Sequence, residues 1–491
     1  MKNLRFLLVA MWLCTVAVTV SAQQPPKREF RGAWIQAVNG QWQGMGRDAM
    51  QVELRRELDA LQAAGLNAIL FQCRVEGDAL YASPYEPWSR YLTGQQGLPP
   101  QPYWDPLAWM VDECHRRGME LHAWINPYRA KTKGTKEMAV THYAIRYPDR
   151  CFHYDGLMLF DPGRPENRQF ICQVAADIVR RYDVDGLHID DYFYPYPAPG
   201  VSIPDDASYA SYGQGRDRGD WRRENVRLFI RELRDSVRAA KPWVKFGVSP
   251  FGIYRNQRSW PEGSRTSGLQ NYDDLYADVL QWLHEGIIDY NIPQLYWEIG
   301  NKAADYEELI RWWSRHAGGR PLIIGQDVER TVKHGDQDRK YALQRQYPTV
   351  AGSCQWYARA VADDHGGYTT RLRQAYHTTP ALQPRMPWID AKAPKAVRHL
   401  KPLFTDELGY VLFWEEPRAK TEADRATRYV VYRFADGERV DVSDPSHIIC
   451  ITRNPYVQVP YAGGHTRYTY AVTALDRLQN ESKAKTIRVR L

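Results

Sequence analysis

Two adjacent carboxylic acids, Asp190 and Asp191, are the residues of this sequence whose type and spacing most directly suggest chemistry. They lie in the run DGLHIDDYFYP at 185–195, among aromatic residues. Burying two carboxylates in such surroundings costs free energy unless partners or catalysis compensate for it. The plainer alternative is a solvated Asp-Asp turn before Tyr192. Of the two interpretations, we favour the catalytic pair.

The alternation of side chains along a strand predicts which way Asp190 points. The residues before it form an apolar strand, in which successive side chains point to opposite faces. Leu187 and Ile189 would then face outward, whereas His188 and Asp190 would face the inside of a barrel. Asp190 is therefore expected at the inner rim as the main catalytic carboxylate, in the role of nucleophile or base. Asp191 would be a second catalytic group or a hydrogen-bonding partner.

Glycosidic hydrolysis usually needs a second carboxyl group as the acid, and the separation of the two groups decides between retention and inversion. The candidates are Asp191, Glu298, Asp327, Glu76 and Asp78. Glu298 is the first choice, because it follows a strand beside Trp297, where a less polar setting would raise its pKa. Arg74 or Arg129 near Asp190 would keep that carboxylate ionised. The sequence leaves the stereochemical outcome open.

Polar and aromatic side chains crowd the ends of three further predicted strands, and C-terminal strand ends build the active site of a barrel. The substrate-binding candidates are Gln72, Arg74, Asp78, Trp88, His122, Trp124, Asn126, Tyr128, Arg129, His188, Tyr192, Gln294, Tyr296 and Trp297. Aromatic rings suit the apolar faces of sugars. The expected stacking platform comes from Tyr81, Trp88, Trp124, Tyr192, Tyr194, Tyr296 and Trp297. Trp282, Trp312 and Trp313 lie in helical patterns and are expected to be packing residues. His122 and His188 could equally be structural hydrogen-bonding groups.

The elements that position these residues alternate between short apolar runs and amphipathic helical stretches, as is typical of βα units. The predicted strands are 32–38, 68–74, 120–126, 186–190, 245–249, 290–297, 321–325 and 352–357. The predicted helices are 52–64, 106–117, 167–182, 222–240, 272–284 and 306–316. Eight such units predict an α/β fold, a (β/α)8 TIM barrel over 28–385. The rival is a doubly wound open sheet, which no glycine-rich phosphate turn supports.

Near residue 390 the pattern changes to short alternating strands, after a linker marked by Pro387 and Pro394. The runs 410–414, 429–433 and 468–474 are typical of successive strands in an all-β, immunoglobulin-like sandwich over 393–491. The last run and the residues after it resemble a fibronectin type III domain. We expect a spacer or a stabilising partner, with Trp414 and Tyr470 buried in its own core, and a barrel that folds without it.

The N-terminus predicts export. Basic residues, an apolar run at 6–20 and a small-residue site at 20–22 are typical of a signal peptide over 1–22. The expected location is periplasmic or extracellular, with association to the cell envelope open, and no later stretch is expected to span a membrane. The net charge of +7 comes without a Lys/Arg block, so nucleic acid is a poor partner. Neither HExxH nor a CxxC spacing appears, so we expect no metal and no cofactor.

Several motifs in order resemble the glycosyl hydrolase-like 10 family over most of residues 28–380. They are RGAW at 31–34, FQCR at 71–74, HAWINPYR at 122–129, DGLHIDDYFYP at 185–195, SPFG at 249–252 and PQLYW at 293–297. The resemblance implies a TIM barrel, export and glycoside hydrolysis, with peptidoglycan glycan among the substrates.

The resemblance also implies kinship with α-amylase-like barrels, in which strand four ends in a catalytic aspartate. Asp190 occupies the matching position. Those barrels carry a glutamate acid at the end of strand five, where this chain has Ser249 to Ile253, so the acid must come from elsewhere. Two alternatives stay open. One is a non-catalytic, glycan-binding barrel of the envelope, and the other is hydrolysis of an α-glucan-like polysaccharide.

Overall fold

The structure is a computed structural model that describes residues 25–461 and 463–490. The predicted signal peptide lies outside the described residues. Within them, no helix combines the length and the apolar character needed to cross a membrane.

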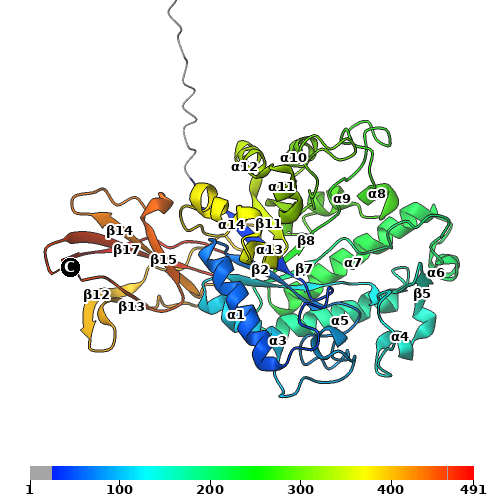
Figure 1. Cartoon of the computed structure of the whole chain (residues 1–491), viewed down its shortest axis with the longest axis horizontal. Helices are drawn as coiled ribbons and strands as arrows, with labels where there is room; N and C mark the ends of the chain where they lie inside the picture. Colours follow the sequence, from blue (N-terminus) through cyan, green and yellow to red (C-terminus); the bar gives the residue numbers. More distant parts are fainter. Residues whose placement is uncertain (1–24, 462, 491) are drawn as a thin grey trace, which may run out of the picture.

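A closed barrel of eight parallel strands forms the larger part of the molecule (Figure 1). The strands are β1 (Phe30–Ile35), β2 (Ala68–Arg74), β3 (Glu120–Ile125), β7 (Gly186–Ile189), β8 (Lys245–Val248), β9 (Tyr290–Asn291), β10 (Leu322–Asp327) and β11 (Val350–Trp356). Strand β1 pairs with both β2 and β11. The pairing closes the sheet, so the barrel prediction is confirmed and the open sheet is excluded.

Helices surround the barrel. The longer ones are α1 (Arg47–Ala63), α3 (Pro106–Arg116), α5 (Pro165–Arg181), α6 (Asp206–Tyr212), α7 (Arg218–Ala240), α10 (Tyr306–Arg315), α11 (Val328–His334) and α12 (Gln337–Gln346). The shorter ones are α2 (Arg90–Thr93), α4 (Tyr143–Arg146), α8 (Asn271–Asp274), α9 (Val279–His284), α13 (Ala358–Ala362) and α14 (Tyr368–Arg371). Leu187 and Ile189 pack in the core between strands and helices, as the alternation predicted.

Two predicted elements need correction, and one small sheet was not predicted. Strand β9 stops at Asn291, because Pro293 has no N–H to donate to a backbone hydrogen bond of the sheet. Gln294 still forms isolated β-bridges with Phe251 and Gly325 on either side. The predicted helix 272–284 is two helices, since the Asp278 side chain caps a new start at α9. A small sheet of β4 (Arg129–Lys131), β6 (Leu157–Phe160) and β5 (Cys151–Tyr154) follows β3 and was not predicted.

The C-terminal part consists of two antiparallel sheets (Figure 1, orange to red). One contains β12 (Arg398–Thr405), β13 (Gly409–Glu415) and β16 (Tyr456–Gln458); the other contains β15 (Ile448–Thr452), β14 (Arg428–Ala435), β17 (Arg467–Leu475) and β18 (Lys485–Arg490). Both sheets contribute to one apolar core that includes Trp414 and Tyr470. The predicted burial of these two residues is confirmed.

Trp414→Ala is expected to lower the free energy of unfolding by about 3–5 kcal/mol, the usual loss for a buried Trp. Trp414 is fully buried and meets Tyr429 of the opposite sheet edge-to-face, with ring centroids 5.3 Å apart. Urea unfolding followed by circular dichroism would measure the loss. Phe404→Ala, at a ring that is 62% exposed, is the matched control and should change stability by less than about 1 kcal/mol. Equal losses would contradict the shared core.

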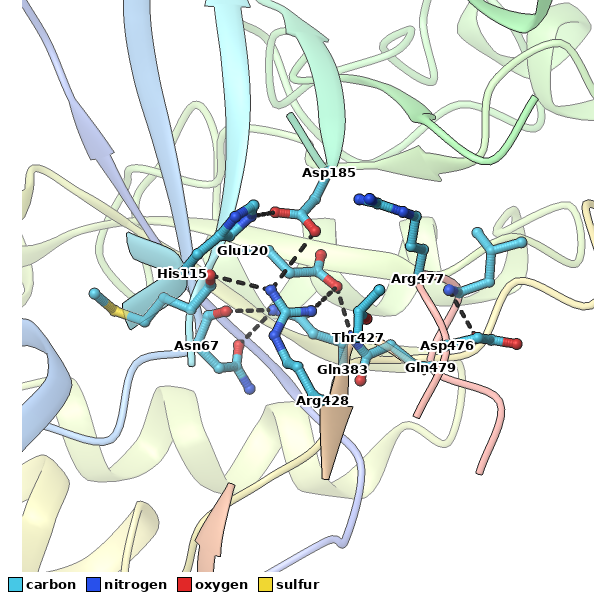
Figure 2. A network of polar contacts seen from close by, with 12 residues as sticks. Asn67, His115, Glu120, Asp185, Gln383, Thr427, Arg428, Asp476, Arg477 and Gln479 are labelled. Carbon is cyan, nitrogen blue, oxygen red and sulfur yellow. Dashed lines mark hydrogen bonds and ion pairs between the residues drawn. The ribbon is translucent and has the colours of Figure 1, made fainter. Parts of the chain in front are cut away.

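The sandwich docks on the end of the barrel where the strands begin (Figures 1 and 2). Arg428, the first residue of β14, reaches Glu120 at the start of β3 and Asp185 just before β7, at 3.8 and 3.6 Å. Leu478 joins Met386 and the lumenal side chains in one apolar cluster. The C-terminal part therefore closes the floor of the barrel.

Candidate active site

A cleft opens at the other end of the barrel, where the strands finish. Its volume is 190 Å³, and its lining residues are Trp34, Trp124, Asp190, Asp191, Tyr192, Ser249, Gln294, Tyr296 and Trp356. They come from β1, β3, the ends of β7 and β8, the segment after β9, and β11. Among the described lining residues, Asp190 and Asp191 are the only carboxylic acids. The structure thus brings the predicted pair into one cavity at the active end of the barrel.

Asp190 follows β7 directly and is almost fully buried. Its Oδ2 accepts hydrogen bonds from the Asn126 side-chain amide and from the Trp124 indole at 3.3 Å. Both donors lie on or just after β3, which pairs with β7. Desolvation by burial, followed by the charge of Asp191, raises the pKa of Asp190 well above its usual value. The prediction that Arg74 or Arg129 would keep this carboxylate ionised is wrong. Arg74 pairs with Glu86 instead, and burial and Asp191 together outweigh the opposing charge of Arg129.

Asp191 begins the loop after β7 and is equally buried. Its Oδ2 accepts a hydrogen bond from the Tyr196 hydroxyl. Desolvation raises the pKa of Asp191 as well, while the hydrogen bonds from Tyr196 and Gln294 oppose that rise. Because the two carboxyl groups share a water-poor site, the pair retains a proton at pH values where an exposed aspartate has lost it.

Four aromatic rings wall the inner part of the cleft. The Trp356 ring lies 6.2 Å from Trp34, 6.3 Å from Trp124 and 6.3 Å from Tyr296, centroid to centroid. Tyr192 stands at the mouth, 39% exposed, with the Arg129 guanidinium 4.5 Å from its ring centre. Among the predicted stacking residues, Trp124, Tyr192 and Tyr296 line the cavity. This wall gives apolar surface for sugar rings beside two acids.

A chain of buried polar groups supports the cleft from below. His188 contacts Ser249 Oγ at 2.9 Å and the Tyr290 hydroxyl at 3.3 Å, and His122 contacts the same hydroxyl at 2.8 Å. Burial keeps His188 neutral by lowering its pKa well below the usual value. His188 and His122 are thus structural hydrogen-bonding groups of the lumen, one of the two roles that the sequence allowed.

Several predicted substrate-binding residues lie outside the cavity lining and hold the scaffold. Arg74 forms a buried ion pair with Glu86 at 2.7 Å, and Gln72 accepts hydrogen bonds from the backbone of Ala37 and Val38. Asp78 accepts from Gln96. The remaining rings pack on neighbours: Tyr128 on Phe229, Trp88 on Tyr103, Trp297 on Phe251, and Tyr81 and Tyr194 in the core. Trp282, Trp312 and Trp313 are buried packing residues, as predicted.

Glu298 is not the buried acid that the sequence suggested. It is partly exposed, accepts a hydrogen bond from Asn301 at 2.7 Å and faces His334 at 3.9 Å. Burial raises the pKa of Glu298, but the hydrogen bond from Asn301, a backbone hydrogen bond and the nearby His334 and Arg330 side chains together outweigh it, so the pKa lies below its usual value. It does not line the cavity. The expected rise of its pKa is therefore wrong, because the polar partners of Glu298 outweigh the effect of burial.

Four residues of the site escaped the sequence analysis: Trp34, Ser249, Trp356 and Tyr196. Strand alternation could have found Trp34, since Ala33 and Ile35 on either side face the helices. Trp356 is the last residue of β11, and the predicted strand 352–357 was not assigned any site residue. Tyr196 lies in a loop without periodicity, so no local signal points to it.

A second cavity of 470 Å³ adjoins the cleft and shares Tyr192 with it. The small sheet after β3 and the loop after β7 form its walls, with Leu157, Leu159 and Pro197 among the apolar residues and Lys133 at its edge. The two cavities together offer room for more than one sugar unit. Within the described residues, no cluster of three or more His, Cys, Asp or Glu side chains could hold a metal ion.

Comparison with known proteins shows the family of the chain. The family described as glycosyl hydrolase-like 10 matches residues 29–342. The chain is 38% identical to "Glycosyl hydrolase YngK" of Bacillus subtilis (strain 168) over 508 residues, which cover 98% of each protein. It is 39% identical to "Glycosyl hydrolase DigH" of Escherichia coli (strain K12) over 269 residues, which cover 52% of this chain and 61% of that protein.

Among solved structures, the catalytic domain of beta-amylase from Paenibacillus polymyxa aligns with a TM-score of 0.49 and 9% identity, covering 72% of this chain and 99% of that chain. The family match extends over more than half of the present chain, and YngK is similar from end to end. The chain therefore belongs to the glycosyl hydrolase-like 10 family, and glycoside hydrolysis is its class of activity, as its motifs predicted.

Proposed function

We propose that the protein hydrolyses a polymeric glycan in the cleft at Asp190 and Asp191, with peptidoglycan glycan strands as the leading substrate. The observation that carries the proposal is a buried pair of carboxyl groups at the C-terminal end of β7, enclosed by aromatic rings. Such a pair can hold and release a proton near neutral pH, which is what general acid–base catalysis requires.

The adjoining cavity supports a polymer over a monosaccharide. It shares Tyr192 with the cleft and continues along β4 and β6, so a glycan chain bound across the scissile bond would rest on both. A net charge of +7 is compatible with an anionic envelope polymer.

Export and the nature of the C-terminal part belong to the same proposal. The signal-peptide pattern at 1–22 supports delivery to the periplasm or the outside. The strand orders β12-β13-β16 and β15-β14-β17-β18 support a fibronectin type III-like sandwich. Its contacts with the barrel floor favour a stabilising role over glycan binding.

The test is product analysis with the mature chain from Gln23. Cell-wall glycan strands, starch and dextran would each be incubated with the wild type and with Asp190→Asn as the matched blank. New reducing ends from wall strands, seen with wild type alone, would support the proposal. Starch or dextran cleavage without action on wall strands would favour the α-glucan alternative. Binding of the glycan without new reducing ends would favour a non-catalytic binding protein and contradict the proposal.

The pH dependence of turnover should reflect the raised pKa of the pair. A group with a raised pKa keeps its proton to higher pH, so the protonated acid persists above the ordinary aspartate value of 3.8. We expect the alkaline limb of the kcat profile above about pH 5. Measured rates between about pH 3 and 9 would check it, with Glu298→Gln leaving the limb in place. A limb close to the ordinary aspartate value would contradict the burial argument.

A further inference from the structure

The cleft lacks a separate carboxyl group that could act on the opposite face of a sugar. Its two acids are neighbours at the end of one strand, and the other sequence candidates are engaged elsewhere. Glu76 accepts from Thr132 and Thr135, and Asp327 caps α11. Hydrolysis by two carboxylates normally places them on either side of the scissile bond. A nucleophile must therefore come from another source, such as the substrate itself.

The aromatic part of the cleft fits an apolar substituent. The indole N–H groups of Trp34 and Trp124 are already used, since they donate to His188 and to Asp190. Sugar hydroxyls pointing there would lose their hydrogen bonds to water without adequate replacement. The volume of 190 Å³ is below the roughly 300 Å³ typical of pockets for drug-sized ligands. One sugar ring with a small methyl-bearing group is the occupant that suits this shape.

We propose that the ring bound in the cleft carries a 2-acetamido group, and that this group, held by Asp190, is the nucleophile while Asp191 is the general acid. The inference rests on the proposed function and narrows its substrate to N-acetylated sugars. The acetyl methyl lies among Trp34, Trp356 and Tyr296, the amide N–H donates to Asp190, and the Tyr296 hydroxyl can donate to the acetamido oxygen.

The chemistry balances in two steps. In the first, the acetamido oxygen bonds to C1, the bond from C1 to the glycosidic oxygen breaks, and that oxygen leaves with the proton of Asp191. The product is a bicyclic oxazolinium ion whose N–H is bonded to the Asp190 carboxylate. In the second, water bonds to C1 and gives a proton to Asp191, and the oxazolinium C1–O bond opens to restore the acetamide. Two displacements at C1 retain the anomeric configuration.

The substrate itself would assign the proton within the pair. Free of ligand, both carboxyl groups have raised pKa values. An amide N–H donated to Asp190 stabilises its ionised form, which leaves the shared proton on Asp191. Asp191 therefore carries the proton that the leaving group needs only when an N-acetylated ring is bound.

The test compares three forms of one polymer: N-acetylated cell-wall glycan strands, the same strands with free amines, and strands re-acylated with trifluoroacetyl groups. Fluorine withdraws electrons from the nucleophilic oxygen, so kcat should fall about a hundredfold, and the free amine should be cleaved about 10³-fold more slowly or not at all. A thiazoline analogue of the bicyclic intermediate should inhibit competitively. Equal turnover of all three overturns this inference alone, whereas no turnover of any form overturns the proposed function and the inference with it.

Azide distinguishes the two aspartates. With Asp191→Ala and an activated aryl glycoside of N-acetylglucosamine, azide should restore turnover and give a glycosyl azide of unchanged anomeric configuration, because it replaces water at the second step. Asp190→Ala should gain nothing from azide. A glycosyl azide of inverted configuration from Asp190→Ala would identify Asp190 as a covalent nucleophile and overturn the assignment.

Discussion

Asp190→Asn and Asp191→Asn are each expected to lower kcat by about 10²–10⁴-fold, the range typical of a lost acid–base group. Affinity for glycan should stay nearly unchanged, because a group that acts in the transition state contributes little to ground-state binding. Steady-state kinetics on any glycan that the wild type cleaves, with calorimetry for binding, would measure both. In Asp190→Asn, the side-chain oxygen of the new amide can still accept from Asn126 and Trp124, so the cleft should keep its shape.

Glu298→Gln is the matched control for these variants. It removes a carboxylate that follows a strand of the same barrel, but one that bonds to Asn301 outside the cavity lining. Its kcat should stay within about twofold of the wild type. If Glu298→Gln were as inactive as Asp191→Asn, the acid would have to be sought outside the pair.

Asp190→Asn is expected to make the protein as stable as the wild type or more stable at neutral pH. Since the pKa of Asp190 is raised on folding, the ionised side chain destabilises the native state, increasingly so as pH rises above the unfolded-state value near 3.8. Asparagine removes that cost. The midpoint of thermal unfolding should therefore equal or exceed the wild-type value at about pH 7, with the difference vanishing near about pH 4. A marked loss of stability at neutral pH would point to a structural role for the carboxylate.

Periodicity was sufficient to predict the barrel and part of its site. A two-residue period fixes which side chains enter the lumen once the strand is recognised. Applied to 186–190, it placed His188 and Asp190 inward and Leu187 outward, and the structure agrees. Trp124 lines the same cavity, as its place in the predicted stacking platform requires.

Periodicity does not predict what happens once a strand ends. Glu298 was expected in the cleft because it follows a strand, yet its carboxylate accepts a hydrogen bond from Asn301 and lies outside the cavity lining. Arg74 was expected to act on Asp190, but its guanidinium donates instead to Glu86, which lies twelve residues later in an irregular segment. Both errors concern side chains whose partners are chosen by loop geometry and by long-range contacts, which leave no local pattern.

The interface between barrel and sandwich is the largest feature that the sequence did not predict. The expected barrel that folds alone conflicts with the buried charges at the floor. Lys245 pairs with Glu120 at 2.6 Å, and both side chains are 1% exposed. Gln479 donates to the same carboxylate at 2.8 Å. Satisfying these groups needs residues from both the barrel and the C-terminal part, so we expect one cooperative unit rather than two separable ones.

Arg428→Met is expected to lower the free energy of unfolding by about 3 kcal/mol or more, as removal of one partner from a buried charge cluster usually does. The Arg428 guanidinium donates to the Met119 carbonyl at 3.2 Å and lies between Glu120 and Asp185 (Figure 2). Methionine fills similar volume without replacing the positive charge, so two buried carboxylates lose a counter-charge. Urea unfolding would measure the loss.

Arg425→Met is the control for that loss. Arg425 lies in the same domain, its side chain is 56% exposed, and it faces Glu422 at 3.8 Å, so its loss should cost less than about 0.5 kcal/mol.

The decisive readout for Arg428→Met is whether the barrel, the sandwich or both lose stability. If the floor joins the two parts, barrel and sandwich should still unfold together, at lower urea. A barrel transition unchanged from wild type, with the sandwich alone weakened, would restore the independent barrel that the sequence suggested. Cutting the chain near Ala393 should then leave a soluble barrel, whereas shared unfolding predicts that the same cut, by uncovering Glu120 and the lumenal cluster around Leu478, yields an insoluble one.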